Sequence, residues 1–573
     1  MTEISQAVLE KVKGWLQDPS IDEGTKQELR DLEKTNPVEL EDRFYRDLEF
    51  GTGGLRGVIG AGSNRMNRYT VARASQGFAE YILKAHAGKA GQPSVVIAHD
   101  CRHFSPEFAL EAALVLAGNG IVAKLFLSLR PTPQLSFSVR DLGATGGIVV
   151  TASHNPPEYN GYKVYNATGG QLVPHEAEEV IDRIQAISSF AQVKRLSREE
   201  AEAQGLLVWL GEAEDEAFAE VVANTSVNRE LMAAGAAKDV VVVFTPLHGT
   251  GNLPVRRVLT KIGFTQVHIV KEQELPDGDF PTVKSPNPEE REAFKMAIEL
   301  GKQVGADLLI GTDPDADRMG AVVRTADGEY EILTGNQSGS LLVHYVLSQM
   351  KEAGTLPKNG AVVKTIVTSE LGAVIACHYG AEVFNTLTGF KYIGEKMNEF
   401  EASGDYTYLF GYEESYGYLA GNYARDKDAI VASTLFCEAA AYYKRQGKTL
   451  LDVLEELYAQ FGYYRETLAS RTLKGKDGLA QINALMEEFR SAPPQEVAGV
   501  GVADVLDYTL GLDGLPKGDV LKFLLTDGSW FCLRPSGTEP KIKFYFGVRG
   551  TSNEDAKARL EAMQQEVLAR VDR

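Results

Sequence analysis

Residues 147–156 read GIVVTASHNP, an apolar run that ends in small and polar residues. A short β-branched run followed by Thr, Ser, Asn and Pro predicts a strand that breaks into a tight loop. In open α/β sheets, reactive groups lie where strands end. Ser153 is therefore expected to present its hydroxyl on a constrained turn at the mouth of a crevice. Two interpretations stay open here: Ser153 is a nucleophile, or it is a turn residue that caps its own backbone.

Strand, loop, amphipathic helix and strand alternate in three successive stretches of the chain. This alternation predicts an α/β fold with mostly parallel sheets. Ser105-Pro106-Glu107 has the order of N-cap, proline and acid that begins a helix. The expected strands are 94–98, 121–127, 147–150, 240–244, 307–310, 361–367 and 406–410; the expected helices begin at 105 and 288 or lie near 370–379 and 391–400.

The last hundred residues follow a different pattern, typical of an α+β module. Two apolar runs flank Asp527-Gly528-Ser529, which predicts a hairpin turn. A third strand and a long amphipathic helix follow. The expected strands are 520–526, 530–533 and 541–548, the expected helix is 553–571, and the expected domains are 1–205, 206–328, 329–460 and 461–573.

Length and charge narrow the classes of protein that fit this chain. Its 573 residues predict roughly three to five domains. The 59 Lys and Arg against 79 Asp and Glu give a net charge of −20, which disfavours nucleic acid or an anionic membrane as a partner. We find neither a membrane-spanning segment nor a signal peptide. The four scattered cysteines lack metal-type or redox spacing, so we expect reduced thiols in a cytoplasmic protein.

The loop DPDADR follows an expected strand and carries Asp313, Asp315 and Asp317. Three carboxylates at i, i+2 and i+4 can converge on one hard cation through oxygen. An EF-hand is excluded, because Arg318 and Arg324 stand where that loop needs Gly and Glu. A divalent ion here, with Mg²⁺ the expected one, would neutralise phosphate oxygens. The alternative is a solvated acidic turn.

Two further loops carry groups suited to phosphates and sugars. RPSGTEPK (534–541) offers a guanidinium fork, hydroxyls and unobstructed backbone N–H groups for a phosphate. GYEESYG (411–417) is expected to place Glu413 and Ser415 on the same side of an extended loop, where they suit sugar hydroxyls. Each loop could also be an ordinary polar turn.

Other polar segments are less specific. TGFK (388–391) and RDKD (425–428) have the status of polar loops. GTGGLRG (51–57) fails as a dinucleotide-binding fingerprint because no strand leads into it, but Arg56 in this glycine-rich setting could reach a phosphate. Lys163 could transfer protons, or it could be a surface lysine.

Two histidines lie in or near these loops. His154 follows Ser153 directly, and adjacent residues in an extended loop point apart. We therefore do not expect His154 to act as a base toward Ser153. His248, in a glycine-rich loop, is expected to be structural.

Taken together, these loops resemble the motifs of the α-D-phosphohexomutase superfamily and, within it, the phosphoglucomutases. The resemblance covers nearly the whole chain. It implies four domains around a central cleft: three similar mixed α/β domains and a C-terminal α+β domain. TASHNP resembles the phosphoserine loop of the family, DPDADR its metal loop, GYEESYG its sugar-binding loop and RPSGTEPK its phosphate-binding loop.

The resemblance also implies roles for individual residues. Ser153 would carry the phosphoryl group, with Arg56 and Lys163 as further catalytic residues. The implied metal site is Ser153, Asp313, Asp315 and Asp317, and the implied substrate-binding residues are Thr388, Gly389, Glu413, Ser415, Lys427, Arg534, Ser536, Gly537 and Thr538. Some relatives carry a histidine two residues after the serine of the sugar loop; Gly417 stands there in this chain, which excludes such an acid–base group.

The implied activity is interconversion of α-D-glucose 1-phosphate and glucose 6-phosphate. It would use Mg²⁺, a phosphoserine and a sugar 1,6-bisphosphate as primer and intermediate. Mannose or pentose phosphates remain alternative substrates, and a sugar-phosphate phosphatase or a non-catalytic binder remain alternative functions. The expected partners are small sugar phosphates, and the expected state is a monomer or a homodimer.

Overall fold

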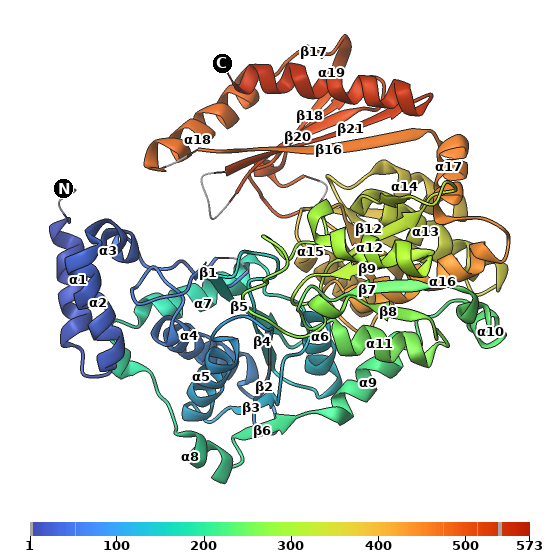
Figure 1. Cartoon of the computed structure of the whole chain (residues 1–573). Coiled ribbons are helices and arrows are strands. Elements are labelled where there is room, and N and C mark those ends of the chain that lie inside the picture. The colour runs from blue at the N-terminus through green and yellow to red at the C-terminus, as the bar shows by residue number, and fades with distance from the viewer. Residues whose placement is uncertain (1–3, 52, 474, 513, 537–540, 573) are drawn as a thin grey trace. The chain divides into compact units, whose positions relative to one another are not determined.

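The computed structural model describes residues 4–51, 53–473, 475–512, 514–536 and 541–572 (Figure 1). Its contacts divide the chain into two compact units. The first holds the chain up to Val322 together with Tyr418–Cys437, and the second holds Val323–Gly417 and the chain from Glu438 onward. No helix within the described ranges is long and apolar enough to cross a membrane. All four cysteines are unpaired.

Three short helices open the first unit: α1 (Gln6–Gln17), α2 (Glu23–Thr35) and α3 (Pro37–Phe44). Asp22 caps α2 through the Thr25 N–H group, and Asn36 followed by proline begins α3. The helices share a small core that includes Trp15, Leu29 and Phe44. Because Arg43 of α3 donates to the carbonyl of Ala61 at 3.1 Å, this helical group braces the segment that follows the first strand.

The first sheet has the strand order β1-β5-β4-β2-β3-β6. Its strands are β1 (Leu55–Val58), β2 (Ser94–His99), β3 (Val122–Phe126), β4 (Gly146–Val150), β5 (Tyr159–Asn166) and β6 (Leu207–Leu210). The strands β2, β3, β4 and β6 pair in parallel, while β5 runs antiparallel to β4 and β1. Sequence analysis identified neither β1 nor β5, and both carry expected site residues.

Helices cover both faces of this first sheet, which explains its nearly continuous apolar strands. Val95 and Ile97 of β2 join the core that contains residues of α4 (Arg68–His86), α5 (Ser105–Gly118) and α7 (Pro174–Ala186). Val96 and Ala98 join the core on the opposite face, formed with α6 (Thr132–Asp141). The loops that follow β2 and β4 are thereby held on a rigid scaffold.

In the second α/β region, β7 (Val242–Thr245) pairs in parallel with β8 (Val267–Ile269) and β9 (Leu308–Thr312). The helix expected from 288 begins a few residues later, as a 3₁₀ turn (Arg291–Phe294) that leads into α12 (Lys295–Val304). Two further elements, α11 (Asn252–Lys261) and β8, precede it and were not expected. The aspartate loop connects β9 to β10 (Met319–Arg324).

In the second unit, β12 (Gly360–Thr365) pairs in parallel with β13 (Glu382–Thr386) and β14 (Thr407–Glu413). The predicted helices are confirmed as α14 (Glu370–Tyr379) and α15 (Phe390–Ser403). The remaining elements between the first sheet and the C-terminal region are α8 (Arg198–Ala203), α9 (Glu212–Ala223), α10 (Arg229–Ala233), β11 (Tyr330–Ile332), α13 (Gly335–Glu352), β15 (Gly417–Ala420), α16 (Ala429–Lys444) and α17 (Leu450–Phe461).

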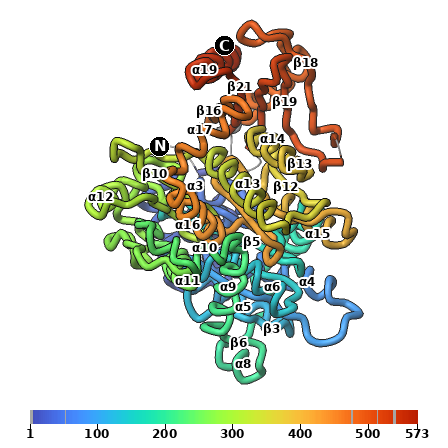
Figure 2. Tube along the Cα trace, turned by 90° about the vertical axis from the view of Figure 1, so that its right-hand side faces the viewer, coloured from blue at the N-terminus to red at the C-terminus, as the bar shows by residue number. Residues whose placement is uncertain are grey.

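The C-terminal sheet is antiparallel, in the order β16-β21-β20-β19-β18-β17. Alternate residues of its strands face opposite cores: Phe531 and Leu533 pack with α18 and α19, whereas Trp530 and Cys532 pack against Ile366 and its neighbours. Figures 1 and 2 show α19 lying along this sheet. The elements are β16 (Tyr463–Thr472), α18 (Gly475–Ser491), β17 (Glu496–Val497), β18 (Val500–Asp507), β19 (Leu521–Leu525), β20 (Trp530–Pro535), β21 (Lys541–Gly550) and α19 (Asn553–Val571).

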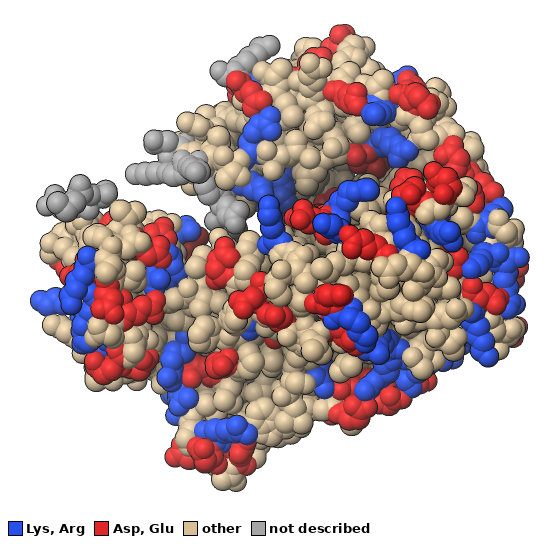
Figure 3. Space-filling model, viewed as in Figure 1, with Lys and Arg blue, Asp and Glu red and all other residues tan. Residues whose placement is uncertain are grey.

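The predicted sheet types are confirmed: mixed, mostly parallel sheets come first and an antiparallel sheet with helices comes last. The predicted hairpin between β19 and β20 and the predicted final helix are also confirmed. On the face seen in Figure 3, acidic and basic side chains of the described residues are interspersed rather than gathered by sign.

Candidate active site

Ser153 lies in the turn after β4, and its side chain is 4% exposed. Its backbone has a φ of 51°, in the left-handed region that costs an L-residue roughly 1–2 kcal/mol. The backbone N–H donates to Thr151 Oγ1 at 2.8 Å, so Thr151 caps this turn. The hydroxyl of Ser153 instead donates to Asp313 Oδ2 at 2.7 Å. The serine hydroxyl is thus directed at the aspartate loop and does not cap its own turn.

A buried arginine holds the strained turn in place. The guanidinium of Arg102 donates to the carbonyl oxygens of Ser153 at 2.5 Å, Pro156 at 2.8 Å and Tyr159 at 3.1 Å, and to that of Asn155. Charge-assisted hydrogen bonds of this kind are the strong ones in proteins. Sequence analysis missed Arg102. The only available signal was an arginine just beyond the end of a buried strand.

The expectation that His154 points away from Ser153 was wrong. Nδ1 of His154 lies 3.2 Å from Ser153 Oγ. Adjacent side chains point apart only in an extended loop, and the positive φ of Ser153 makes this loop turn instead. Burial, together with the nearby charges of Arg318 and Arg56, holds the pKa of His154 well below its ordinary value. His248 is structural as expected: its ring contacts the Leu275 carbonyl and the Thr282 hydroxyl.

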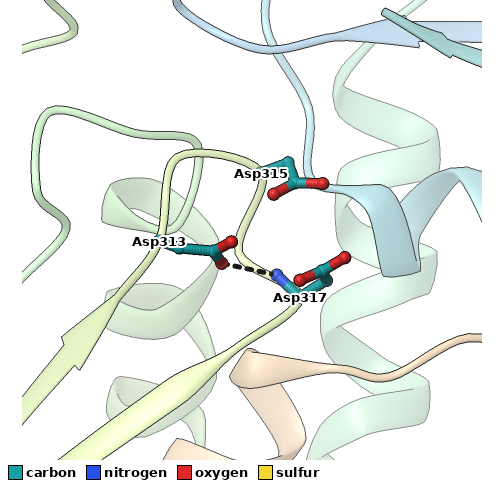
Figure 4. Close-up of side chains that lie close together, drawn as sticks. All are labelled: Asp313, Asp315 and Asp317. Carbon is teal, nitrogen blue, oxygen red and sulfur yellow. Dashed lines mark hydrogen bonds between the residues drawn. The ribbon is translucent and has the colours of Figure 1, made fainter. Parts of the chain in front are cut away.

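The three aspartates of the loop between β9 and β10 are buried and point toward one another (Figure 4). One oxygen from each of Asp313, Asp315 and Asp317 lies within 4.8 Å of the others. The backbone N–H groups of Asp317 and Arg318 both donate to Asp313 Oδ1, at 3.1 and 3.0 Å. Burial, reinforced by the charges of Asp315 and Asp317, raises the pKa of Asp313 well above its usual value. Despite burial, the nearby charges of Lys163 and Lys427 lower the pKa of Asp315 and of Asp317 below its usual value, so part of the negative charge of the cluster is balanced.

Two lysines contact the Oδ2 atoms of Asp315 and Asp317. Lys163 Nζ lies 2.8 Å from Asp315 Oδ2 and 3.3 Å from Asp317 Oδ2, and Lys427 Nζ lies 2.9 Å from the latter atom. The alternative that Lys163 is a surface residue was wrong, because it is buried on β5. Despite burial, the two aspartates raise the pKa of Lys163 above its ordinary value, so it carries a proton here.

Two carboxylate oxygens that the lysines do not contact are suited to bind a cation. Oδ1 of Asp315 and Oδ1 of Asp317 are buried and have no hydrogen-bond partner among the described residues. A buried carboxylate oxygen without a partner is costly. A hard divalent cation takes oxygen ligands of this kind. The donor set and its two unsatisfied acceptors therefore suit a metal ion.

Backbone contacts from two other loops fix the aspartate loop. Thr132, at the start of α6, donates its N–H to the Asp315 carbonyl at 2.9 Å and its hydroxyl to Asp315 Oδ2 at 2.8 Å. The Thr250 N–H donates to the Pro314 carbonyl at 2.8 Å. Gly249 must lack a side chain, because a Cβ there would lie 2.5 Å from Pro314 Cα. Sequence analysis did not identify these supports, since they come from segments distant in the chain.

We expected Arg56 to lie in a glycine-rich loop, and this was wrong. Arg56 lies on β1, in register with Gly161 of β5. Its Nη1 donates to Asn155 Oδ1 at 3.2 Å, next to the Ser153 turn. The side chain is exposed. The structure thus places Arg56 beside the same turn that presents Ser153.

In the second unit, the residues expected to bind the sugar partly lie together. Glu413 is the last residue of β14, is buried, and accepts from the Gly389 N–H at 2.8 Å. The hydroxyl of Thr388 is buried without a hydrogen-bond partner among the described residues. The expected extended loop was wrong: 414–416 form a tight turn that contains Ser415. Glu414 anchors this turn by accepting from two threonine hydroxyls, Thr365 at 3.1 Å and Thr368 at 3.2 Å.

Arg534 is the second-last residue of β20, which ends at Pro535, and Ser536 comes directly after the strand. The Ser536 N–H donates to the Lys541 carbonyl at 2.7 Å. Burial, with the like charge of Arg534 beside it, lowers the pKa of Lys391 to about 8. Lys391 was quoted in TGFK but not identified as a site residue. The remaining two expected phosphate-binding residues, Gly537 and Thr538, lie outside the described residues.

This fold and this site define a multidomain α/β protein in which a serine hydroxyl meets an aspartate cluster suited to a metal ion. Comparison with known families matches four phosphoglucomutase/phosphomannomutase domains in order. Alpha/beta/alpha domains I, II and III match residues 47–191, 216–328 and 334–461, and the C-terminal domain matches residues 472–566. The chain belongs to the phosphoglucomutase/phosphomannomutase family, as the motifs predicted.

Curated relatives agree with this assignment, and a solved structure shares the fold. A phosphoglucomutase from Staphylococcus aureus (strain USA300) is 36% identical over 93% of this chain and 95% of its own. One from Staphylococcus haemolyticus is 39% identical over 89% of this chain and 91% of its own. The open form of the Paramecium phosphoglucomutase pp63/parafusin shares the fold, with a TM-score of 0.66, 18% identity, and coverage of 92% of this chain and 95% of that chain.

Proposed function

We propose that this protein is a phosphoglucomutase. It interconverts α-D-glucose 1-phosphate and glucose 6-phosphate through a phosphorylated Ser153 and glucose 1,6-bisphosphate. The observation that carries the proposal is the 2.7 Å contact of Ser153 Oγ with Asp313, in a buried cluster with two unsatisfied carboxylate oxygens. Curated phosphoglucomutases that align over nearly all of this chain support the same activity.

The chemistry assigned to Ser153 is phosphoryl transfer. The 6-hydroxyl of glucose 1-phosphate attacks the phosphorus on Ser153, the bond from phosphorus to Oγ breaks, and the bond to O6 forms. The bisphosphate then returns its 1-phosphoryl group to Oγ and leaves as glucose 6-phosphate. Lys163, protonated beside Asp315, is the proposed proton carrier: it gives its proton to Oγ as the bond from phosphorus to Oγ breaks, and the proton of the 6-hydroxyl then replaces it on Lys163.

We propose Mg²⁺ as the resident cation, held by Asp313, Asp315, Asp317 and an oxygen on Ser153. When bound, it would neutralise charge on the transferring phosphoryl group. The chain's own contribution is to place Ser153 Oγ against these carboxylates and to hold the turn through Arg102. Arg56, next to the turn, is proposed to contact the same phosphoryl group.

In the second unit, we propose that Arg534, Ser536, Gly537 and Thr538 bind the phosphate that is not transferred. Glu413, Ser415, Thr388 and Gly389 are proposed to bind sugar hydroxyls, and Lys427 of the first unit is proposed to bind the substrate. The positive charge shared by Arg534 and Lys391 suits a phosphate, and the unsatisfied hydroxyl of Thr388 suits a sugar oxygen.

Turnover on glucose 1-phosphate, mannose 1-phosphate and ribose 1-phosphate, each with a sugar bisphosphate as primer, tests the proposal. We expect the glucose substrate to isomerise fastest, without release of inorganic phosphate. Release of inorganic phosphate alone would instead identify a phosphatase. If no sugar phosphate isomerises, the proposed function is wrong.

We further propose the domain limits 1–205, 206–328, 329–460 and 461–573. The four matched regions support them, with the third extending one residue past its limit. The four unpaired cysteines support a reducing, cytoplasmic location. A monomer or a homodimer is the proposed state, with small sugar phosphates as partners.

A further inference from the structure

Strand β5 presents two polar residues on the same face. Residues i and i+2 of a strand project to the same side, so Lys163 and Tyr165 do so on β5. Lys163 contacts Asp315 and Asp317 directly. Tyr165 is fully buried, and its hydroxyl donates to Asp426 Oδ2 at 2.9 Å. The strand that presents one ammonium to the aspartate cluster therefore also contacts a residue from the distant 425–428 segment.

Asp426 links this tyrosine to the second ammonium of the site. Its other oxygen, Oδ1, accepts from the Lys427 N–H at 2.9 Å and from Lys427 Nζ at 3.3 Å. Lys427 Nζ in turn lies 2.9 Å from Asp317 Oδ2. A continuous series of contacts thus runs from Tyr165 through Asp426 and Lys427 to Asp317.

The residues on either side are tied down independently. The N–H of Arg425 donates to Ser136 Oγ at 2.8 Å. Asp428 begins α16 by accepting from the N–H groups of Ile430 and Val431, at 2.6 and 3.2 Å. Between these fixed points, the long side chain of Lys427 has several rotatable bonds, and ordering it costs conformational entropy. A fixed carboxylate beside its Nζ reduces the positions that the ammonium can occupy.

We infer that Tyr165 and Asp426 are positioning residues that hold the Lys427 ammonium at Asp317, so that β5 determines the place of both ammonium groups in the site. The consequence for turnover rests on the proposed function, whereas the consequence for cation binding does not. Burial alone demands a partner for the Tyr165 hydroxyl. A tyrosine that only satisfies its own buried hydroxyl would act independently of Lys427. If Tyr165 is a positioning residue, its effect on turnover and on cation binding depends on Lys427.

A double-mutant cycle separates the two possibilities. Y165F removes only the hydroxyl and leaves the ring in place. Y162F is the matched control: Tyr162 lies on the same strand with its side chain on the opposite face, is fully buried, and its hydroxyl pairs with Ser75 Oγ at 2.9 Å. Each variant is made in the wild-type and in the K427M background. The readouts are kcat and KM for glucose 1-phosphate and the Mg²⁺ concentration that half-saturates the rise in melting temperature.

We expect Y165F to lower kcat about 10-fold with little change in KM, and to lower the half-saturating Mg²⁺ concentration about 3-fold, since less positive charge then stands on Asp317. Neither change should recur when Y165F is added to K427M. Y162F should leave both quantities as in the wild type. D426N should reproduce Y165F, and it decides the matter if Y165F does not fold.

Equal effects of Y165F with and without Lys427, or equal effects of Y165F and Y162F, would overturn the inference. Should the wild-type protein isomerise no sugar phosphate, the proposed function fails. The Mg²⁺ titration still decides the positioning role in that case, because it needs no turnover.

Discussion

The aspartate loop of the first unit and the phosphate loop of the second unit have opposite electrostatic imbalances. Asp315 and Asp317 each keep one buried oxygen without a hydrogen-bond partner among the described residues, although lysines contact their other oxygens and Arg318 Nε lies 3.9 Å from Asp317 Oδ1. Beside the second loop, Arg534 and Lys391 lie close enough that their like charges help lower the pKa of Lys391 to about 8. Carboxylate oxygens without hydrogen-bond partners mark the first region, and neighbouring positive charges mark the second.

This difference supports the proposal that the two regions bind different ligands. Under the proposed function, a divalent cation would balance the first region and a phosphate would balance the second. Substitutions in one region should therefore leave the ligand response of the other unchanged. Variants in each region test whether the two ligand responses are independent, and the largest expected effect comes first.

The largest effect is expected for S153A, which removes the proposed phosphoryl carrier. We expect turnover to fall by about four orders of magnitude or more. Intact mass spectrometry after incubation with glucose 1,6-bisphosphate should show no phosphorylated protein. The matched control is S138A, which removes a buried hydroxyl that has no hydrogen-bond partner among the described residues. Wild-type turnover in S153A would remove Ser153 from the mechanism.

D315N comes next, because it removes one charge from the cluster that is proposed to hold the cation. We expect activity to fall about a thousand-fold and the Mg²⁺-dependent rise in melting temperature to disappear. Chelation of the wild-type protein should abolish turnover, and added Mg²⁺ should restore it. An unchanged melting-temperature response in D315N would show that the cation binds elsewhere.

R534Q should have a smaller effect, limited to substrate binding. Loss of the guanidinium fork is expected to raise KM for glucose 1-phosphate about 100-fold. The Mg²⁺-dependent rise in melting temperature should match that of the wild type. R549Q serves as the control, because Arg549 is exposed on the neighbouring strand β21 and stacks on Tyr464. If R534Q also altered the Mg²⁺ response, the separation between the two regions would be refuted.

The smallest effect concerns the pH dependence of KM. Lys391 is a cation below its pKa of about 8 and neutral above it, since burial and Arg534 disfavour the charged form. Any contribution of Lys391 to the proposed phosphate binding is therefore complete well below pH 8 and is lost as the pH rises through about 8. We expect KM to rise about threefold between pH 7 and pH 9 in the wild type and to change less in K391M. A flat KM in the wild type over this range would contradict a phosphate contact by Lys391.

The elements that carry site residues were predictable where the signal is local. An apolar run that ends in TASHNP, and one that ends in DPDADR, each predict a strand followed by a polar loop, and β4 and β9 end there. The antiparallel strand β5 was missed because its alternation of Asn, Gly, Tyr and Lys does not resemble a buried parallel strand. That miss is why Lys163 could not be distinguished from a surface residue.

Long-range contacts account for most of what the sequence did not predict at the site. Arg102 holds the Ser153 turn, and Thr132 holds Asp315, from positions 51 and 183 residues away. No local pattern encodes such pairings. His154 shows a different failure, since one backbone angle at Ser153 reverses the expected direction of a neighbour. The roles of the site residues remain predictions until the variants above are measured.

The segment Tyr418–Cys437 belongs by its contacts to the first unit, although the chain on both sides of it belongs to the second. The polypeptide therefore passes between the units three times, at 322/323, 417/418 and 437/438. One consequence concerns inheritance: no uninterrupted stretch of the gene encodes either unit. A truncating mutation directly after codon 322 deletes Lys427, which contacts Asp317 of the first unit, along with the second unit.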